Sequence, residues 1–206
     1  MHLFDAATLS DGALEQILSF LRSGGVIGFP TDTAYGLGAD PFNVQAVRRI
    51  FEIKGRPESK PILLLVDSVA MAARLAFLSD TALALAERFW PGPLTMILPA
   101  RSSVPAAVTA GTGTVGVRWP DTDFAGRLLH AWGQPITATS ANRSGEPSCV
   151  TAAQVREQLG DSIDALVDGG ELPARGGSTL LDLTGTPARL LRKGPIPEYA
   201  LSDVLK

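Results

Sequence analysis

The sequence has a single cysteine, Cys149, so no internal disulfide bond can form. A reducing compartment is the simplest explanation, although a secreted protein without disulfides would show the same count. The first residues lack the basic stretch followed by an apolar stretch that marks a signal peptide. No apolar run approaches the roughly 20 residues that a membrane helix requires. We therefore expect a cytoplasmic protein with no membrane segment.

Several familiar catalytic signatures are also missing. The two histidines, His2 and His130, do not have the local spacing of a zinc site. There is no Gly-x-Ser-x-Gly elbow and no Gly-x4-Gly-Lys-Ser/Thr phosphate loop. Cys149 has no base close to it in the sequence, which favours a structural role over that of a nucleophile. Catalysis through a covalent enzyme intermediate is therefore not expected.

The composition indicates one folded domain over residues 1–206. Hydrophobic residues make up 45% and charged residues 19%, which is enough apolar material for a full core. The net charge is −3, whereas a nucleic-acid binder that relies on overall charge is normally basic. Any contact with RNA would therefore need a local basic patch.

Hydrophobic spacing predicts short strands and helices without a strict βαβ alternation. Helices are expected after the N-cap residues Ser10 and Asn43, and the second must end near Gly55 because Pro57 follows. Further helices are expected to start near residues 67, 79, 124 and 152. Strands are expected at 26–29, 62–66, 94–98, 114–118, 136–139 and 163–167, with a hairpin formed by 178–183 and 188–192. This mixture predicts an α/β domain with a mixed, twisted sheet.

Short polar segments rich in glycine or proline follow the expected strands. They are residues 30–38, 54–61, 114–120, 137–145, and the pair 175–179 and 191–195. Lys54 and Arg56 lie in the most basic segment, where prolines hold a potential anion site. If residues 114–118 alternate as a strand, Arg118 shares a face with Thr114 and suits a carboxylate. Taken singly, each segment is explained as well by an ordinary turn or a solvated loop.

The sequence motifs in these segments, and their order along the chain, resemble those of the YrdC-type family, the threonylcarbamoyl-AMP synthases. The resemblance runs from about Gly24 to Pro195. Its eight landmarks are Gly25 to Leu37, Lys54-Gly55-Arg56-Pro57, Trp90-Pro91-Gly92-Pro93-Leu94-Thr95, Val117-Arg118-Trp119-Pro120, Ser140-Ala141-Asn142, Asp168-Gly169-Gly170, Ser178-Thr179 and Leu191-Arg192-Lys193-Gly194. One departure is that some relatives carry a histidine in the strand expected at 62–66, where this chain has none.

The resemblance implies a nucleotidyltransferase that makes threonylcarbamoyl-adenylate and pyrophosphate from L-threonine, bicarbonate and ATP. A downstream transferase complex would pass the threonylcarbamoyl group to an adenosine beside the tRNA anticodon. The implied fold is an open, twisted α/β sheet around a basic concave pocket. The chain resembles the short form with one domain, so residues 30–38 or 143–148 would have to cover ATP in place of the C-terminal domain of longer relatives.

The resemblance also implies roles for individual residues. Lys54 and Arg56 are the catalytic candidates, because they would neutralise phosphate charge. The ATP-binding set is Lys54, Arg56, Thr114, Ser140, Asn142, Ser148 and Arg192. The threonine-binding set is Thr31, Arg118 and Ser178. No dedicated metal ligands are expected, since Mg²⁺ would bridge phosphate oxygens, and the nucleophile would be the carbamate of threonine itself.

Three other interpretations compete with this one. A paralogue of the same fold without the activity is disfavoured by the intact Lys54-Gly55-Arg56 and Ser140-Ala141-Asn142. An RNA-binding or ribosome-maturation factor is disfavoured by the 6% aromatic content and by the lack of an RNA-binding signature, although direct RNA binding stays open. A carbamoyl-transfer module of hydrogenase-maturation type would carry zinc-finger and acylphosphatase-like regions, which the sequence lacks.

Overall fold

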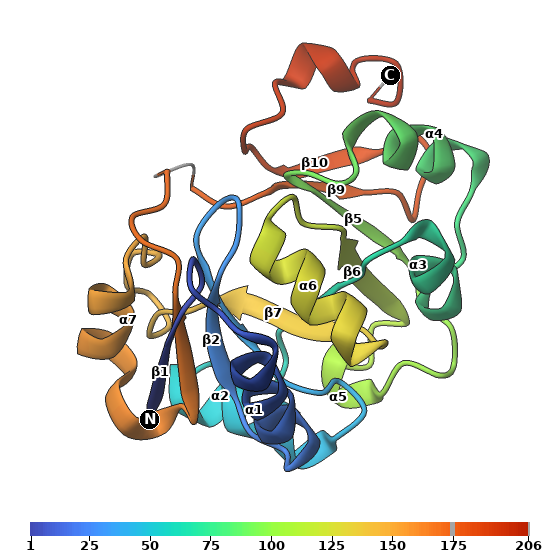
Figure 1. Ribbon diagram of the computed structural model, residues 1–206. Helices are drawn as coiled ribbons and strands as arrows, with labels where there is room; N and C mark the ends of the chain where they lie inside the picture. The colour runs from blue at the N-terminus through green and yellow to red at the C-terminus, as the bar shows by residue number, and fades with distance from the viewer. Residues whose placement is uncertain (174–175, 206) are drawn as a thin grey trace.

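The computed structural model describes residues 1–173 and 176–205, so Arg175 of the segment 175–179 and the last residue, Lys206, lie outside the described residues. Within this part of the chain, ten strands form one sheet in the order β1-β8-β2-β3-β7-β4-β6-β5-β9-β10 (Figure 1). The sheet contains both parallel pairs, such as β4–β6, and antiparallel pairs, such as β4–β7. The expected α/β fold with a mixed sheet is therefore confirmed.

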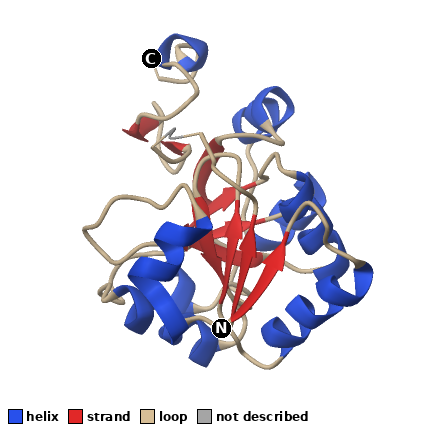
Figure 2. Cartoon of the chain, turned by 60° about the vertical axis from the view of Figure 1, so that its left-hand side comes forward, coloured by secondary structure: helices blue, strands red, loops and turns tan. Residues whose placement is uncertain are grey.

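The described strands are β1 (His2–Asp5), β2 (Ile27–Pro30), β3 (Tyr35–Gly38), β4 (Leu63–Leu65), β5 (Leu94–Pro99), β6 (Thr114–Arg118), β7 (Ile136–Ser140), β8 (Ala165–Asp168), β9 (Thr179–Asp182) and β10 (Arg189–Arg192). The helices are α1 (Asp11–Arg22), α2 (Val44–Lys54), α3 (Val69–Leu75), α4 (Asp80–Phe89), α5 (Ala106–Thr109), α6 (Asp123–Trp132) and α7 (Ala152–Leu159), with 3-10 turns η1 (Gly160–Ser162) and η2 (Glu198–Leu201). Figure 2 shows helices on both sides of the sheet. No helix in the described ranges is long and apolar enough to cross a membrane.

Helix α2 begins and ends as its sequence predicts. The Asn43 side chain accepts hydrogen bonds from the backbone N–H groups of Gln45 and Ala46 and so caps the first turn. At the other end Gly55 adopts a left-handed conformation with φ of 57°, which stops the helix after Lys54. This turn sends the chain at Arg56 in a new direction.

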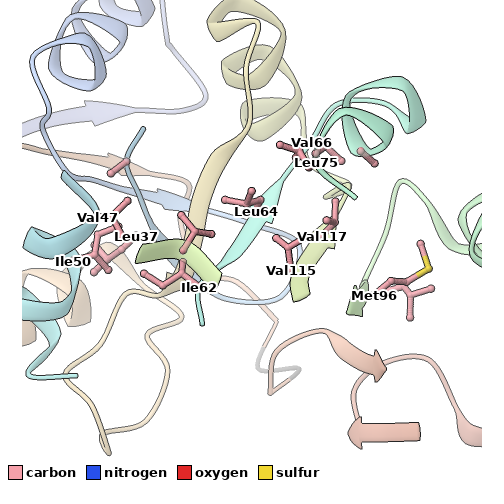
Figure 3. Close-up of a cluster of buried hydrophobic side chains, with 14 of the residues drawn as sticks. Leu37, Val47, Ile50, Ile62, Leu64, Val66, Leu75, Met96, Val115 and Val117 are labelled. Carbon is pink, nitrogen blue, oxygen red and sulfur yellow. The ribbon is translucent and has the colours of Figure 1, made fainter. Parts of the chain in front are cut away.

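Two buried clusters pack against the sheet. One lies around Leu64, Val115 and Val117 at the centre of the sheet and extends to Ile50 of α2 and Leu75 of α3 (Figure 3). The other joins Ile17 of α1, Phe29 of β2 and Leu128 of α6, among others. Strand β4, Leu63–Leu65, is apolar throughout, whereas β6 alternates between the buried Val115 and Val117 and residues that line the cavity.

Three elements differ from the sequence-based expectation. Residues 30–38 were expected to form a polar loop, but their second half is the buried strand β3, which pairs with β2 and β7. A Cβ at Gly38 would lie 2.6 Å from Phe29 Cε1, so this glycine permits close packing of the strand rather than a turn. Strand β1 and the short helix α5 were not expected at all. The hairpin of β9 and β10 is confirmed.

The C-terminal segment lies beside α4 and the hairpin (Figure 1). Arg88 of α4 donates to the Asp203 carboxylate at 2.7 Å and to the carbonyl of Ala200 at 2.6 Å. The segment is therefore tied to the same end of the sheet as β9 and β10.

Candidate active site

A cavity of about 340 Å³ opens over the strands β4 to β7 and β9. Its floor is apolar and its polar side chains lie around that floor. The floor residues are Leu63, Leu65, Ile97, Ala138 and Leu180. Three arginines, Arg56, Arg118 and Arg192, line it, and no lining residue in the described ranges is an aspartate or glutamate. The cavity therefore favours an anion.

The structure brings most of the predicted site residues together in this cavity. Eight of the ten line it, namely Thr31, Arg56, Thr114, Arg118, Ser140, Ser148, Ser178 and Arg192. Lys54 and Asn142 are not among the lining residues. The predicted ATP and threonine sets thus share one site, with two members placed behind its wall.

Arg118 is held in place at the end of β6. Its Nη2 donates to Asp32 Oδ1 at 2.5 Å, its Nη1 to Thr33 Oγ1 at 3.0 Å and its Nε to the carbonyl of Gly92 at 3.1 Å. A guanidinium has five N–H donors, so two remain for a ligand. Burial lowers the pKa of Arg118, while Asp32 opposes this effect and keeps the cation compensated.

Arg192 and Ser178 form a second polar group on the hairpin side. Arg192 Nε donates to the carbonyl of Ser178 at 2.9 Å, and Arg192 Nη2 donates to Ser178 Oγ at 3.1 Å. The hydroxyls of Ser178 and the fully buried Thr95 lie 2.6 Å apart. Burial lowers the pKa of Arg192, and repulsion from Arg192 contributes to the lowered pKa of Arg118. The two guanidiniums therefore form one positive region.

Arg56 reaches the cavity from the turn after α2. Its Nη2 donates to the carbonyl of Pro61 at 2.9 Å, and its Nη1 lies 3.5 Å from Thr139 Oγ1. Its Nε is buried and has no hydrogen-bond partner in the described structure. Burial lowers the pKa of Arg56. A buried donor without a partner is uncommon in folded proteins and suits an anionic ligand.

Lys54 and Asn142 lie in the wall rather than in the lining. The Lys54 side chain is buried, and its Nζ donates to the backbone carbonyls of Ser140 and Asn142. Burial, and then the charge of Arg56, lower the pKa of Lys54 to about 8. Asn142 Nδ2 donates to the carbonyls of Arg143 and Glu146, which closes the loop after β7.

Thr31 lines the cavity, but its hydroxyl is already engaged. Thr31 Oγ1 donates to the carbonyl of Ala34 at 2.6 Å and accepts from the backbone N–H groups of Thr33 and Ala34 at 3.3 Å. It closes the turn between β2 and β3. Its hydroxyl retains only limited acceptor capacity for a ligand.

Sequence reasoning missed three polar residues of the site. Asp32 and Thr33 orient Arg118, and Thr95 contacts Ser178. Strand alternation in β5 places Thr95 on the same face as Ile97, so Thr95 was detectable once that strand was assigned. The pairing of Asp32 with Arg118 had no local signal, because 86 positions separate them.

A dedicated metal centre has no support in the described ranges. No group of three or more histidine, cysteine, aspartate or glutamate residues there is placed to hold a metal ion. The cavity offers the hydroxyls of Thr114, Ser140 and Ser148 instead of carboxylates. A cation at this site would therefore need most of its ligands from a bound substrate and from water.

Comparison with known proteins places this geometry in a family. The Sua5/YciO/YrdC family model, described as "Telomere recombination", matches residues 19–194. A Pyrococcus abyssi threonylcarbamoyl-AMP synthase is 43% identical over 187 residues, which are 90% of this chain and 55% of that protein. A Thiobacillus denitrificans threonylcarbamoyl-AMP synthase is 40% identical over 84% of this chain and 92% of that protein.

The fold comparison gives the same result. The crystal structure of P. abyssi Sua5 complexed with L-threonine superposes with a TM-score of 0.94 at 39% identity, over 100% of this chain and 61% of that one. The chain thus spans less than two thirds of this relative's length. With the family match covering most of the sequence, the chain belongs to the Sua5/YciO/YrdC family.

Proposed function

We propose that this chain is an L-threonylcarbamoyladenylate synthase, which makes threonylcarbamoyl-AMP and pyrophosphate from L-threonine, bicarbonate and ATP. The observation that carries the proposal is the cavity lined by three arginines over an apolar floor, with no carboxylate in its described lining. Such surroundings favour a polyanion, because charge interactions are stronger where water is displaced. Two relatives with this named activity and the L-threonine complex of P. abyssi Sua5 support it.

The phosphates of ATP would lie against Arg56 and Arg192. The unpartnered Nε of Arg56 and the guanidinium of Arg192 supply forked N–H donors that suit phosphate oxygens. The hydroxyls of Thr114, Ser140 and Ser148 would complete the ATP site. Lys54 and Asn142 do not line the cavity, so they would affect nucleotide binding indirectly, through the residues that do.

L-threonine would bind beside the nucleotide, with its carboxylate on Arg118. The two remaining N–H groups of Arg118 match a carboxylate, and Asp32 fixes their direction. Ser178 Oγ would contact a polar group of the amino acid, and Thr31 would shape the neighbouring turn. This arrangement leaves the threonine nitrogen free to attack the carbon of bicarbonate, which forms the N–C bond of the carbamate and releases water.

The reaction would need no protein nucleophile. The carbamate oxygen of N-carboxythreonine would attack the α-phosphate of ATP, form the acyl-phosphate bond and release pyrophosphate. The arginines would neutralise the charge on the reacting phosphates and on the leaving pyrophosphate. Most of the rate would then come from positioning two bound substrates next to each other.

Mg²⁺ is proposed to arrive with ATP. Mg²⁺ keeps several waters and commonly binds through substrate phosphates. The hydroxyls of Ser140 and Ser148 line the cavity and would be available to a nucleotide-bound Mg²⁺. The metal would supply further neutralisation of phosphate charge.

The product implies a partner. A mixed anhydride of a carbamate and AMP is a reactive acyl donor, so a transferase must use it promptly. We assign that role to a tRNA threonylcarbamoyl transferase complex, which would modify an adenosine beside the anticodon. A non-catalytic RNA-binding role is the alternative that the experiment must separate.

The test is a direct synthesis assay. The purified chain is mixed with ATP, Mg²⁺, labelled bicarbonate and L-threonine, and pyrophosphate and labelled adenylate are measured. We expect threonine-dependent product, a strong loss in Arg56→Gln, and wild-type rates in the matched control Arg156→Gln on the exposed side of α7. Well-folded protein that yields no adenylate refutes the proposal, and tight RNA binding without ATP turnover would support the alternative.

A further inference from the structure

Lys54 is tied to the loop that follows β7 by three separate contacts. Its Nζ donates to the backbone carbonyl of Ser140 and, at 2.6 Å, to that of Asn142. Its own backbone carbonyl accepts the N–H of Ser144 at 2.8 Å. The side chain is only 3% exposed. The last residue of α2 is thus bonded along one side of residues 140–148.

This loop, residues 140–148, carries part of the cavity lining. Ser140 and Ser148 at its two ends both line the cavity. Between them, Asn142 Nδ2 donates to the carbonyls of Arg143 and Glu146, at 2.8 and 2.7 Å, and so fixes the bend of the loop. Lys54 holds one side of that bend, and Asn142 closes its interior.

The geometry separates Lys54 from Arg56, although only one residue lies between them. Gly55 in its left-handed conformation turns the chain, so Arg56 lines the cavity and Lys54 does not. An ammonium has three N–H donors, and two of those of Lys54 already point at backbone carbonyls. The third N–H is not engaged by these carbonyls, but Lys54 is buried and does not line the cavity, so its ammonium would have to leave this position to bind a phosphate directly.

We propose that Lys54 is a positioning residue, which holds the 140–148 loop so that the hydroxyls of Ser140 and Ser148 face the substrate, and that it is not a direct phosphate ligand. The inference rests on the proposed function for its catalytic meaning, because it assigns how that site is kept in shape. The lowered pKa of Lys54 agrees with this role: an uncharged amine still has two N–H groups, as many as the carbonyls it serves.

The main test compares the loop in the nucleotide-free protein before and after Lys54→Met. Methionine keeps much of the side-chain volume and removes the N–H donors. Hydrogen–deuterium exchange is followed for the amides of residues 142–146. We expect about tenfold faster exchange, since local opening becomes easier when the loop loses two bonds. Arg56→Gln is the matched control, because it removes a cavity cation next to Lys54 and should leave exchange in this loop unchanged.

Activity measurements then separate positioning from binding. Lys54→Met should lower kcat with a smaller change in the KM for ATP, whereas Arg56→Gln should raise the KM for ATP. Unchanged exchange in Lys54→Met together with an ATP defect like that of Arg56→Gln would overturn the proposal. The exchange measurement needs no turnover, so a failed synthesis assay would count against the proposed function and not against the role of Lys54 in the loop.

A footprint of the wild-type protein covers the case in which Lys54→Met fails to fold. Lysine acetylation is measured by mass spectrometry with and without ATP and Mg²⁺. We expect Lys54 to stay unlabelled in both samples, because it is held in the wall, while the exposed Lys60 is labelled in both. Labelling of Lys54 that ATP suppresses would mean that the ammonium faces the cavity, and it would overturn the proposal.

Discussion

Burial of Lys54 should make the stability of the nucleotide-free protein depend on pH above about pH 8. In the folded chain, burial and the nearby Arg56 lower the pKa of the ammonium from 10.5 to about 8. The unfolded chain keeps the ordinary value. Between these two pKa values the unfolded chain holds a proton that the folded chain has lost. The free energy of unfolding must therefore rise with pH in this window.

The size of the effect follows from the shift. Each pH unit inside the window adds about 1.4 kcal/mol to the free energy of unfolding. About 2 kcal/mol should develop between pH 8 and about pH 9.5, and the whole window corresponds to roughly 3 kcal/mol. Below pH 8 both states are protonated, so the unfavourable burial of the charge is constant there. The increase in the free energy of unfolding is therefore lost as the pH falls from the unfolded-state pKa to the folded-state pKa.

Urea unfolding of the wild type and of Lys54→Met at several pH values measures this contribution. Subtracting one curve from the other removes the titration of all other groups. The difference should grow by about 2 kcal/mol between pH 8 and about pH 9.5, on top of a constant offset for the two lost hydrogen bonds. The exposed Lys60→Met should show no such growth against the wild type. A Lys54 difference that stays flat with pH would refute a buried ammonium with a lowered pKa.

Three further results are expected. Arg118→Gln should raise the KM for L-threonine about 30-fold, and the KM for ATP much less, because a charged hydrogen-bond donor to the carboxylate is lost. Steady-state pyrophosphate release measures both KM values, and a larger rise in the KM for ATP would contradict the prediction. Pyrophosphate at about 100 times its Kd should stabilise the fold by about 2.7 kcal/mol, seen as a rise in Tm that Arg192→Gln reduces; no rise would argue against a polyanion cavity. Gly38→Ala should destabilise the chain by about 1–3 kcal/mol, since the new Cβ would meet buried side chains at 2.6 and 2.7 Å, whereas Gly126→Ala meets open space and should not destabilise; urea unfolding of both tests this.

The sequence predicted the elements whose signals are local. The caps Ser10 and Asn43 and the helix stop at Gly55 were read correctly, because each depends on a few neighbouring residues. Strand β1 was not predicted from the sequence, because its only partner in the described sheet is β8, about 160 positions away. Strand β3 was not predicted because its two glycines indicate a turn, whereas Gly38 makes room for packed neighbours.

The same limit applied to the site. Cation type and spacing marked Lys54 and Arg56 as equal candidates for phosphate, and nothing local distinguishes them. The distinction comes from the helix end, where Lys54 completes α2 and meets a loop 86 positions later, while the left-handed Gly55 turns Arg56 into the cavity. The partner of Arg118 was hidden for the same reason, since Asp32 joins it only through the order of strands in the sheet.

The apolar floor of the cavity explains why its arginines and its hydroxyls act together as one anion-binding site. Leu63, Leu65 and Ile97 offer no polar group to a ligand, and partial burial lowers the pKa of Arg56 and of Arg192. Cations in such surroundings repel one another more strongly, and they also attract an anion more strongly, than they would in water. In the described structure only Asp32 compensates this charge directly, and it does so at Arg118 alone. A ligand with several negative charges therefore relieves repulsion at Arg56 and Arg192 as it binds, while a neutral ligand of the same shape would not.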